Sequence, residues 1–464
     1  MARLMSDRRQ KNQLVLAFPA EGRSEAPKAA AKGTESLAAK RSAESPAITE
    51  QLMEEVCEQE NCKQALRRVK GNKGSPGVDG MTVEKLPGYL KEHWPAIREQ
   101  LLNGTYQPQP VLRVEIEKPD GSGMRKLGIP TALDRYLQQA VLQVLQGRWD
   151  RTFSQHSYGF RPGRSAHQAV EAAQQLIGEG FRWVVDLDLE KFFDRVSHDK
   201  LMAKLAERIN DKRMLKLIRA FLRAGVMENG LVSPVDEGTP QGGPLSPLLS
   251  NIVLDELDRE LERRGHRHAR YADDCNIYVR SQRAGERVMA SITEFITTKL
   301  KLKVNQQKSA VARPWGRKFL GFSFTWHREP KKRIAPKALR RYKERVRELT
   351  RRTRGVRVEK VADELGRYLR GWKGYFGLCE TPSVLQALDE WTRRRLRMFL
   401  WKQWKRGTVR FAELTKRGVS KNLAAQTAGS AHGPWRVANS PALAIALPNV
   451  YFASLGIPRL FGNG

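Results

Sequence analysis

The chain is 464 residues long and carries 83 Lys and Arg against 50 Asp and Glu, a formal net charge of +33. That length exceeds one compact core, so we expect two or three domains, and the positive charge favours a nucleic-acid partner over a membrane surface. No run of about 18 apolar residues and no apolar signal core occurs, so we expect neither a membrane span nor secretion. Four scattered cysteines fit a reducing compartment, so we expect a cytoplasmic protein.

Residues 1–47 hold few large apolar side chains and are rich in Ala, Ser, Lys and Glu, so we expect a flexible basic segment. Helical periodicity over 48–72 predicts a helix, which a glycine-rich loop over 70–80 follows. The loop lacks the Gly-Lys-Ser/Thr ending of a phosphate-binding loop, so we interpret it as a plain connection. A second helix is expected over 87–104.

Alternating residues next predict a strand, in which Leu112, Val114 and Ile116 lie on one face. A helix with an apolar face is expected over 131–149. From there to residue 328, strand-like and helical patterns mix, which is typical of an α+β domain.

Two segments of this region carry carboxylates in unusual places. The apolar run Trp183–Leu189 predicts a strand, which places Asp186 and Asp188 on one face. Asp273 and Asp274 stand between two strand-like segments, and the second of these alternates as a half-buried strand does. Adjacent carboxylates repel each other and persist only where something compensates them. Three converging carboxylates are what a site for two Mg²⁺ ions about 3.5–4 Å apart requires.

Residues 331–420 differ in character, because 27 Lys and Arg stand against 9 Asp and Glu on helical patterns. Aromatic residues interleave with these charges: Tyr368, Trp372, Tyr375, Trp391, Trp401 and Trp404. A charge run alone is usually a solvated helix face. Basic residues that alternate with aromatic ones favour a phosphate-binding surface with stacking platforms.

Several motifs follow one another along the chain. They are "SYGFRPGRSAHQAV" (157–170), "DLEKFFD" (188–194), "GTPQGGPLSPLLSNIVLDELD" (238–258), "YADD" (271–274), "LKVNQQKS" (302–309), "FLGF" (319–322) and "LRGWKGYFG" (369–377). In this order they resemble the sequence blocks of bacterial group II intron-encoded reverse transcriptases and maturases. The aspartate pair is similar to that family's Tyr-x-Asp-Asp box.

The resemblance implies an α+β fold, a right-hand polymerase with fingers and a palm that carries an antiparallel catalytic sheet. An α-helical thumb or maturase domain would follow. We expect an N-terminal extension and the start of the fingers at 48–117, fingers and palm at 118–328, the thumb or maturase domain at 329–430, and the C-terminal part of the maturase region at 431–464.

The resemblance also implies the catalytic residues. The metal-binding and catalytic set would be Asp188, Asp273, Asp274 and, through its backbone carbonyl, Leu189. Asp186 stays a rival for the first position. Asp188 is preferred because Phe193, five residues on, then falls where the family keeps a ring against the sugar. The implied cofactor is a pair of Mg²⁺ ions, with Mn²⁺ as a substitute.

Further residues carried over by position would form the nucleotide pocket and the primer end. The pocket would consist of Lys118, Arg125, Phe193, Gln241, Gly242 and Lys308, of which the first two clamp the triphosphate and Phe193 excludes a 2′-hydroxyl. The loop across Lys118 and Arg125 is one residue longer than a common form of the family. Tyr271 and Ala272 would shape the hairpin beside the primer end.

The implied function is an RNA-directed DNA polymerase that takes deoxynucleoside triphosphates, an RNA template and a DNA primer or target. It would also bind group II intron RNA and assist splicing and retrotransposition. No cysteine follows Cys379, so we do not expect a zinc-containing His-Asn-His endonuclease. Two alternatives stay open: a splicing factor whose polymerase domain is a scaffold, and a reverse transcriptase with a host role in DNA repair or phage defence. A viral RNA polymerase is disfavoured, because Phe193 would exclude ribonucleotides.

Overall fold

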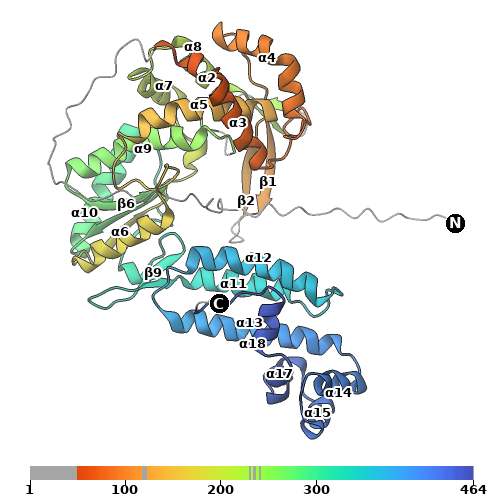
Figure 1. Ribbon diagram of the computed structural model, residues 1–464. Coiled ribbons are helices and arrows are strands. Elements are labelled where there is room, and N and C mark those ends of the chain that lie inside the picture. The colour runs from red at the N-terminus through yellow and green to blue at the C-terminus, as the bar shows by residue number, and fades with distance from the viewer. Residues whose placement is uncertain (1–49, 118–122, 229–230, 234–236, 240–241, 463–464) are drawn as a thin grey trace, which may run out of the picture. The chain divides into compact units, whose positions relative to one another are not determined.

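The computed structural model describes residues 50–117, 123–228, 231–233, 237–239 and 242–462. The predicted flexible segment 1–47 and the predicted pocket residues Lys118 and Gln241 lie outside this part of the chain. A mixed region of helices and sheets comes first, and helices make up nearly all of the chain after residue 335 (Figure 1).

The first sheet has the strand order β2-β1-β4-β5. Its strands are β1 (Val111–Glu117), β2 (Met124–Ile129), β4 (Val226–Glu228) and β5 (Leu231–Ser233), and β4 is parallel to β1. The strand predicted from the alternating residues is β1. The accompanying helices are α2 (Leu52–Val56), α3 (Gln59–Gly71), α4 (Leu86–Leu102), α5 (Ala132–Asp150), α7 (His198–Ala206) and α8 (Lys212–Arg223). The single helix predicted over 48–72 is wrong, because extended backbone at Glu58 (ψ 140°) separates α2 from α3.

The second sheet is antiparallel with the order β6-β7-β3-β8. Its strands are β3 (Trp183–Leu187), β6 (Arg267–Tyr271), β7 (Asp274–Val279) and β8 (Ala310–Ala312). Helix α9 (Ser246–Arg263) leads into β6, α10 (Gln282–Phe295) follows β7, and α6 (Ala166–Gly178) precedes β3. Short helical turns lie at Phe192–Asp194, Ile296–Leu300 and Pro314–Gly316.

This sheet separates two hydrophobic cores. Val185 and Leu187 belong to one core together with residues of α10, whereas Val184 and Tyr278 belong to the other, with residues of α6 and of the C-terminal helices. The prediction of a half-buried β7 is therefore wrong. All residues from Cys275 to Val279 are buried, because helices cover both faces of a central strand.

A short hairpin of β9 (Phe322–Phe324) and β10 (Lys332–Ile334) precedes the C-terminal helices. These are α11 (Pro336–Leu349), α12 (Val358–Phe376), α13 (Pro382–Gln403), α14 (Gly407–Lys416), α15 (Lys421–Ala428), α16 (Pro434–Val437), α17 (Pro441–Ala446) and α18 (Asn449–Ser454). Three of the predicted stacking platforms are core residues instead: Trp372, Trp401 and Trp404 are buried where these helices meet. No helix in the described ranges is both long and apolar enough to cross a membrane.

Candidate active site

A tight turn joins β6 to β7 and carries the adjacent aspartates. Tyr271 pairs with Asp274, so Ala272 and Asp273 form the two-residue turn. Ala272 has a φ of +57°, and a positive φ at the first turn residue is a feature of type II′ hairpin turns. Glycine usually occupies that position, so alanine is held there by its surroundings. The backbone of Gly159 is one of them, since a Cβ on Gly159 would collide with the Ala272 nitrogen.

Arg270 supports this turn from the interior. It is fully buried, and each of its five N–H groups faces an acceptor. The acceptors are Asp258 Oδ1 (2.7 Å) and Oδ2 (2.5 Å), Ser157 Oγ (2.7 Å), Asn251 Oδ1 (3.0 Å) and the carbonyl oxygen of Ala272 (2.9 Å). Burial alone would raise the pKa of Asp258, but the charge and hydrogen bonds of Arg270, with help from His268, lower it to about 2. The turn is thus anchored to helix α9 through an ion pair.

The end of β3 brings a third aspartate to the turn. The last paired residues are Leu187 and Cys275, so Asp188 and Asp274 come next on their strands and face each other. The backbone of Asp188 is fixed, because its N–H donates to Ser309 Oγ (3.0 Å) and its carbonyl accepts from the Asn305 N–H (2.8 Å).

Asp186 and Asp188 share a face of β3 but have different partners. Arg317 binds Asp186 closely, with Nη2 at 2.7 Å and Nε at 2.8 Å from Oδ2. Asp188 has a longer contact, 3.8 Å from its Oδ1 to Lys308 Nζ. Both guanidinium nitrogens contact the same oxygen of Asp186, so that carboxylate already has a close cationic partner, whereas the contact of Asp188 is longer. Asp188 is therefore the better candidate for a metal.

Desolvation and repulsion together raise the pKa values of the two adjacent aspartates. Desolvation, followed by repulsion from Asp273, Asp186 and Asp188, raises the pKa of Asp274 to about 7. The pKa of Asp273 is also raised, by desolvation and by Asp188, against the charges of Arg125 and Arg270.

The donor chemistry of this cluster fits a divalent cation. Among the described residues, no group of three His, Cys, Asp or Glu side chains is arranged so that it could already hold a metal ion. Repulsion from neighbouring carboxylates nevertheless contributes to the raised pKa values of Asp273 and Asp274, and a hard cation would remove that repulsion. Leu189 is buried directly after Asp188 and pairs with Val304 in an isolated bridge.

Two of the described residues that were predicted for the pocket, Arg125 and Lys308, interact with the aspartates. Arg125 lies on β2, and its charge acts on Asp273. Gly242 has a φ of +143°, and a Cβ there would collide with the carbonyl oxygen of Gly128, so the pocket motif lies against the end of β2. Phe193 is half-buried, and its carbonyl accepts from the N–H of Thr239 in the same motif at 2.6 Å.

Other residues near the turn were not found from the sequence: Arg270, Asp258, Asn251, Arg317 and Tyr375. The charge of Asp274 acts on Tyr375, which lies on α12 and donates through its hydroxyl to the Leu320 carbonyl at 2.8 Å. Arg317 precedes the "FLGF" block by two positions and Arg270 precedes "YADD" by one. Proximity to those motifs was the available signal for both.

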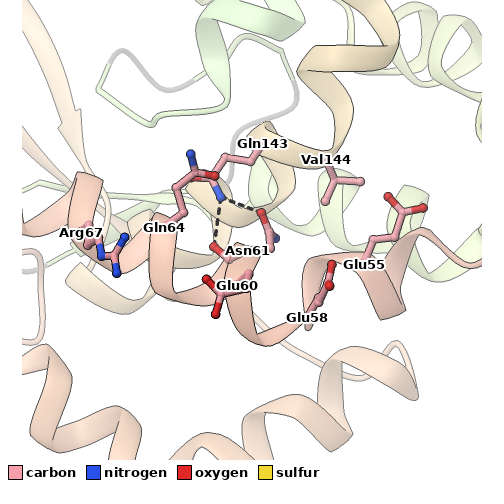
Figure 2. Close-up of a pocket in the computed structure, with 8 residues that line it drawn as sticks. All are labelled: Glu55, Glu58, Glu60, Asn61, Gln64, Arg67, Gln143 and Val144. Atoms are coloured by element: carbon pink, nitrogen blue, oxygen red, sulfur yellow. Dashed lines mark hydrogen bonds between the residues drawn. The ribbon is translucent and has the colours of Figure 1, made fainter. Parts of the chain in front are cut away.

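A cavity of about 510 Å³ lies in a different part of the fold, between α2, α3 and α5 (Figure 2). Its lining residues are Glu55, Glu58, Glu60, Asn61, Gln64, Arg67, Gln143 and Val144. Gln143 Nε2 donates to the carbonyl oxygen and to Oδ1 of Asn61, at 3.0 and 2.6 Å, and so ties α5 to α3 across it. Its lining contains none of the turn's aspartates, so we interpret it as structural.

Residues 116–324 match the family model "Reverse transcriptase (RNA-dependent DNA polymerase)", and residues 339–418 match "Group II intron, maturase-specific domain". The Escherichia coli protein YkfC is 34% identical over 324 residues, which cover 61% of this chain and 84% of that protein. The chain belongs to the group II intron-type reverse transcriptases. It is therefore an RNA-directed DNA polymerase with a maturase-specific domain, and the expected right-hand fold with a helical C-terminal region is confirmed.

This reverse transcriptase is also similar to the group II intron-encoded protein LtrA of Lactococcus lactis subsp. cremoris. The two are 40% identical over 195 residues, 42% of this chain and 32% of LtrA, so the chain spans about a third of that relative. A solved structure, "Partial Cas6-RT-Cas1--Cas2 complex", overlaps 53% of this chain and 43% of its own at 27% identity. Its TM-score of 0.36 is too low to define a common fold.

Proposed function

We propose that this reverse transcriptase joins deoxynucleotides to a primer by a two-metal reaction at the β6–β7 turn. The observation that carries the proposal is the convergence of Asp188, Asp273 and Asp274 at the turn, where desolvation and neighbouring carboxylates raise the pKa values of Asp273 and Asp274. Two Mg²⁺ ions held by these carboxylates and the Leu189 carbonyl would activate the primer 3′-hydroxyl and stabilise the leaving pyrophosphate.

The protein's own groups would do the rest. Arg125, whose charge acts on Asp273, would bind the triphosphate together with Lys118. Phe193 would exclude a 2′-hydroxyl from the sugar pocket, and Gln241 and Gly242 would lie beside the incoming nucleotide. Lys308 would supply positive charge near Asp188. Arg270 and Asp258 would hold the turn in position so that no reorganisation is needed during the reaction.

We also propose that the maturase-specific region binds group II intron RNA and assists its splicing and retrotransposition. The support is the match over 339–418 and the 27 Lys and Arg of residues 331–420, which suit phosphate contacts beyond the polymerase cleft.

Primer extension on an RNA template with Mg²⁺ and deoxynucleotides tests the polymerase site. The comparison is between wild type, Asp273→Asn and the surface control Asp199→Asn, whose side chain is 83% exposed. We expect DNA from wild type and control and at least a 10³-fold lower rate for Asp273→Asn. Full activity of Asp273→Asn would contradict the assigned site. Tight intron-RNA binding without any DNA synthesis by wild type would favour the splicing-factor alternative.

A further inference from the structure

Phe160 combines backbone strain with an exposed ring beside the proposed catalytic turn. Its φ is +58°, a left-handed conformation that a bulky side chain rarely adopts. The residue is 47% exposed, so burial of its side chain does not offset that strain. Its ring centroid lies 6.2 Å from that of Tyr271, with the ring planes at 42°. Strained backbone conformations cluster at functional sites, so the strain at Phe160 suggests a functional role for its side chain.

The residues on both sides of Phe160 are fixed. The Gly159 carbonyl accepts a hydrogen bond from Asn251 Nδ2 at 2.8 Å, and the Gly159 backbone leaves no room for a side chain against the turn. Arg161 is buried and donates to Asp150 Oδ1 at 2.8 Å and to the carbonyl oxygen of Ser157 at 2.9 Å. The Phe160 ring therefore projects from a backbone that is rigid before any substrate binds.

The same network supports both Phe160 and the aspartates. Asn251 donates to the Gly159 carbonyl and accepts from Arg270, which in turn donates to the Ala272 carbonyl. The Tyr158 N–H donates to the Arg270 carbonyl at 2.8 Å, so the segment before Phe160 runs along β6. A nucleotide placed against the turn would meet the Tyr271 and Phe160 rings at a fixed position relative to Asp273.

We propose that Phe160, together with Tyr271, forms a preorganised aromatic contact for the terminal nucleotide of the primer strand. Rings bind nucleotides without regard to base identity, which suits an enzyme that copies any template. The primer strand is favoured over the template because the 3′-hydroxyl must lie beside the aspartates that Tyr271 flanks. The inference rests on the proposed role of the turn as the site of nucleotide addition.

Substitutions at Phe160 separate a substrate contact from a structural role. We expect Phe160→Ala to weaken the Kd for a primer–template duplex roughly tenfold and Phe160→Tyr to stay within about twofold of wild type. Phe160→Gly should weaken binding as much as Phe160→Ala but keep a Tm at or above wild type, because glycine tolerates a positive φ. The KM for deoxynucleotides should not change. The matched control is Trp326→Ala, an exposed aromatic (67%) on the loop before β10.

Fluorescence anisotropy on the full chain measures duplex binding, and thermal melts measure stability. Together they distinguish a substrate contact from a structural role. A lower Tm for both Phe160→Ala and Phe160→Gly with an unchanged duplex Kd would overturn the proposal and make the residue structural. An abasic nucleotide identifies the strand. The effect of Phe160→Ala should shrink when the primer 3′ end is abasic and persist when the template position opposite it is abasic, and the reverse pattern would overturn the assignment to the primer.

The two proposals fail in different ways. If Asp273→Asn still extends primers, the proposed active site is wrong whatever Phe160 does. If Asp273→Asn is inactive while Phe160→Ala binds and extends primers as wild type does, only the aromatic contact is wrong.

Discussion

Asp258 lies on helix α9 and Asp274 begins strand β7, and their pKa values shift in opposite directions. Asp258 is fully buried and its pKa falls to about 2, because Arg270 and His268 compensate it. Asp274 is accessible to water and its pKa rises to about 7, because desolvation and three neighbouring carboxylates act on it. Desolvation raises the pKa of both carboxylates, so burial alone does not account for the opposite directions. Partner charges decide ionisation here, and the turn is where the protein's own carboxylates are left in excess.

The largest expected effect distinguishes the two aspartates of β3. Asp188→Asn should lower the rate of nucleotide addition at least 10³-fold, because it removes a proposed metal ligand. Asp186→Asn should lower it less than about tenfold, since Arg317 already occupies that carboxylate as its ion-pair partner. Single-turnover primer extension at saturating Mg²⁺ measures both. A larger loss for Asp186→Asn would exchange their roles.

The second prediction concerns the buried ion pair between Arg270 and Asp258. Arg270→Lys keeps the charge but cannot reach all of the acceptors, so we expect unfolding in urea to show a loss of about 2–3 kcal/mol. The control is Arg259→Lys, whose partner is Asp255 and whose side chain is 54% exposed. A surface pair of this kind contributes at most about 1 kcal/mol. Equal losses in the two variants would mean that burial of the Arg270 pair does not matter.

The third prediction concerns the charge of Asp274, which has carboxylates as neighbours. Its pKa in the fold, about 7, lies above the value of about 3.9 for an unfolded chain, so folding stability is lost as pH rises from about 4 to 7. Asp274→Asn removes this penalty. We expect a Tm several degrees above wild type at pH 8 in EDTA and a smaller difference at pH 5. Thermal melts with added Mg²⁺ complete the test, since Mg²⁺ should raise the Tm of wild type more than that of the variant.

The smallest effect concerns Lys308. Its side chain is 63% exposed and its ammonium lies 3.8 Å from Asp188 Oδ1, so solvent screens the interaction. We expect Lys308→Ala to raise the KM for deoxynucleotides about threefold with little change in kcat. Steady-state kinetics at low and high salt provide the measurement. A loss above a hundredfold would place Lys308 in direct contact with the triphosphate.

The sequence was informative where a pattern is local. Alternation predicted β1, the apolar run predicted β3, and the adjacent aspartates predicted a turn between two strands. Periodicity also predicted α4 and α5 to within a few residues. The order of the sequence blocks carried the family resemblance, and the matches over 116–324 and 339–418 confirm the family.

The errors came from tertiary packing, which no local pattern encodes. Polar Asn276 between apolar neighbours predicted a solvated face for β7, but a second core covers that face. The interleaved Trp401 predicted an exposed platform, whereas helix packing buries it. Arg270 on β6 and Asp258 on α9 are 12 positions apart, and they form an ion pair because α9 packs against β6. Sequence spacing alone could not predict this pair, since it depends on how the two elements pack.

Helix α9 connects the pocket motif to the turn that carries Asp273 and Asp274. It begins at Ser246, three residues after Gly243 of the pocket motif, and its Asn251 and Asp258 reach the turn through Arg270. A displacement of the N-terminal end of α9 would therefore also move Arg270 and the turn that Arg270 holds. Substrate affinity and chemical rate should therefore drift together in variants along 246–258, and an engineer who wishes to tune one of them should leave this helix unchanged.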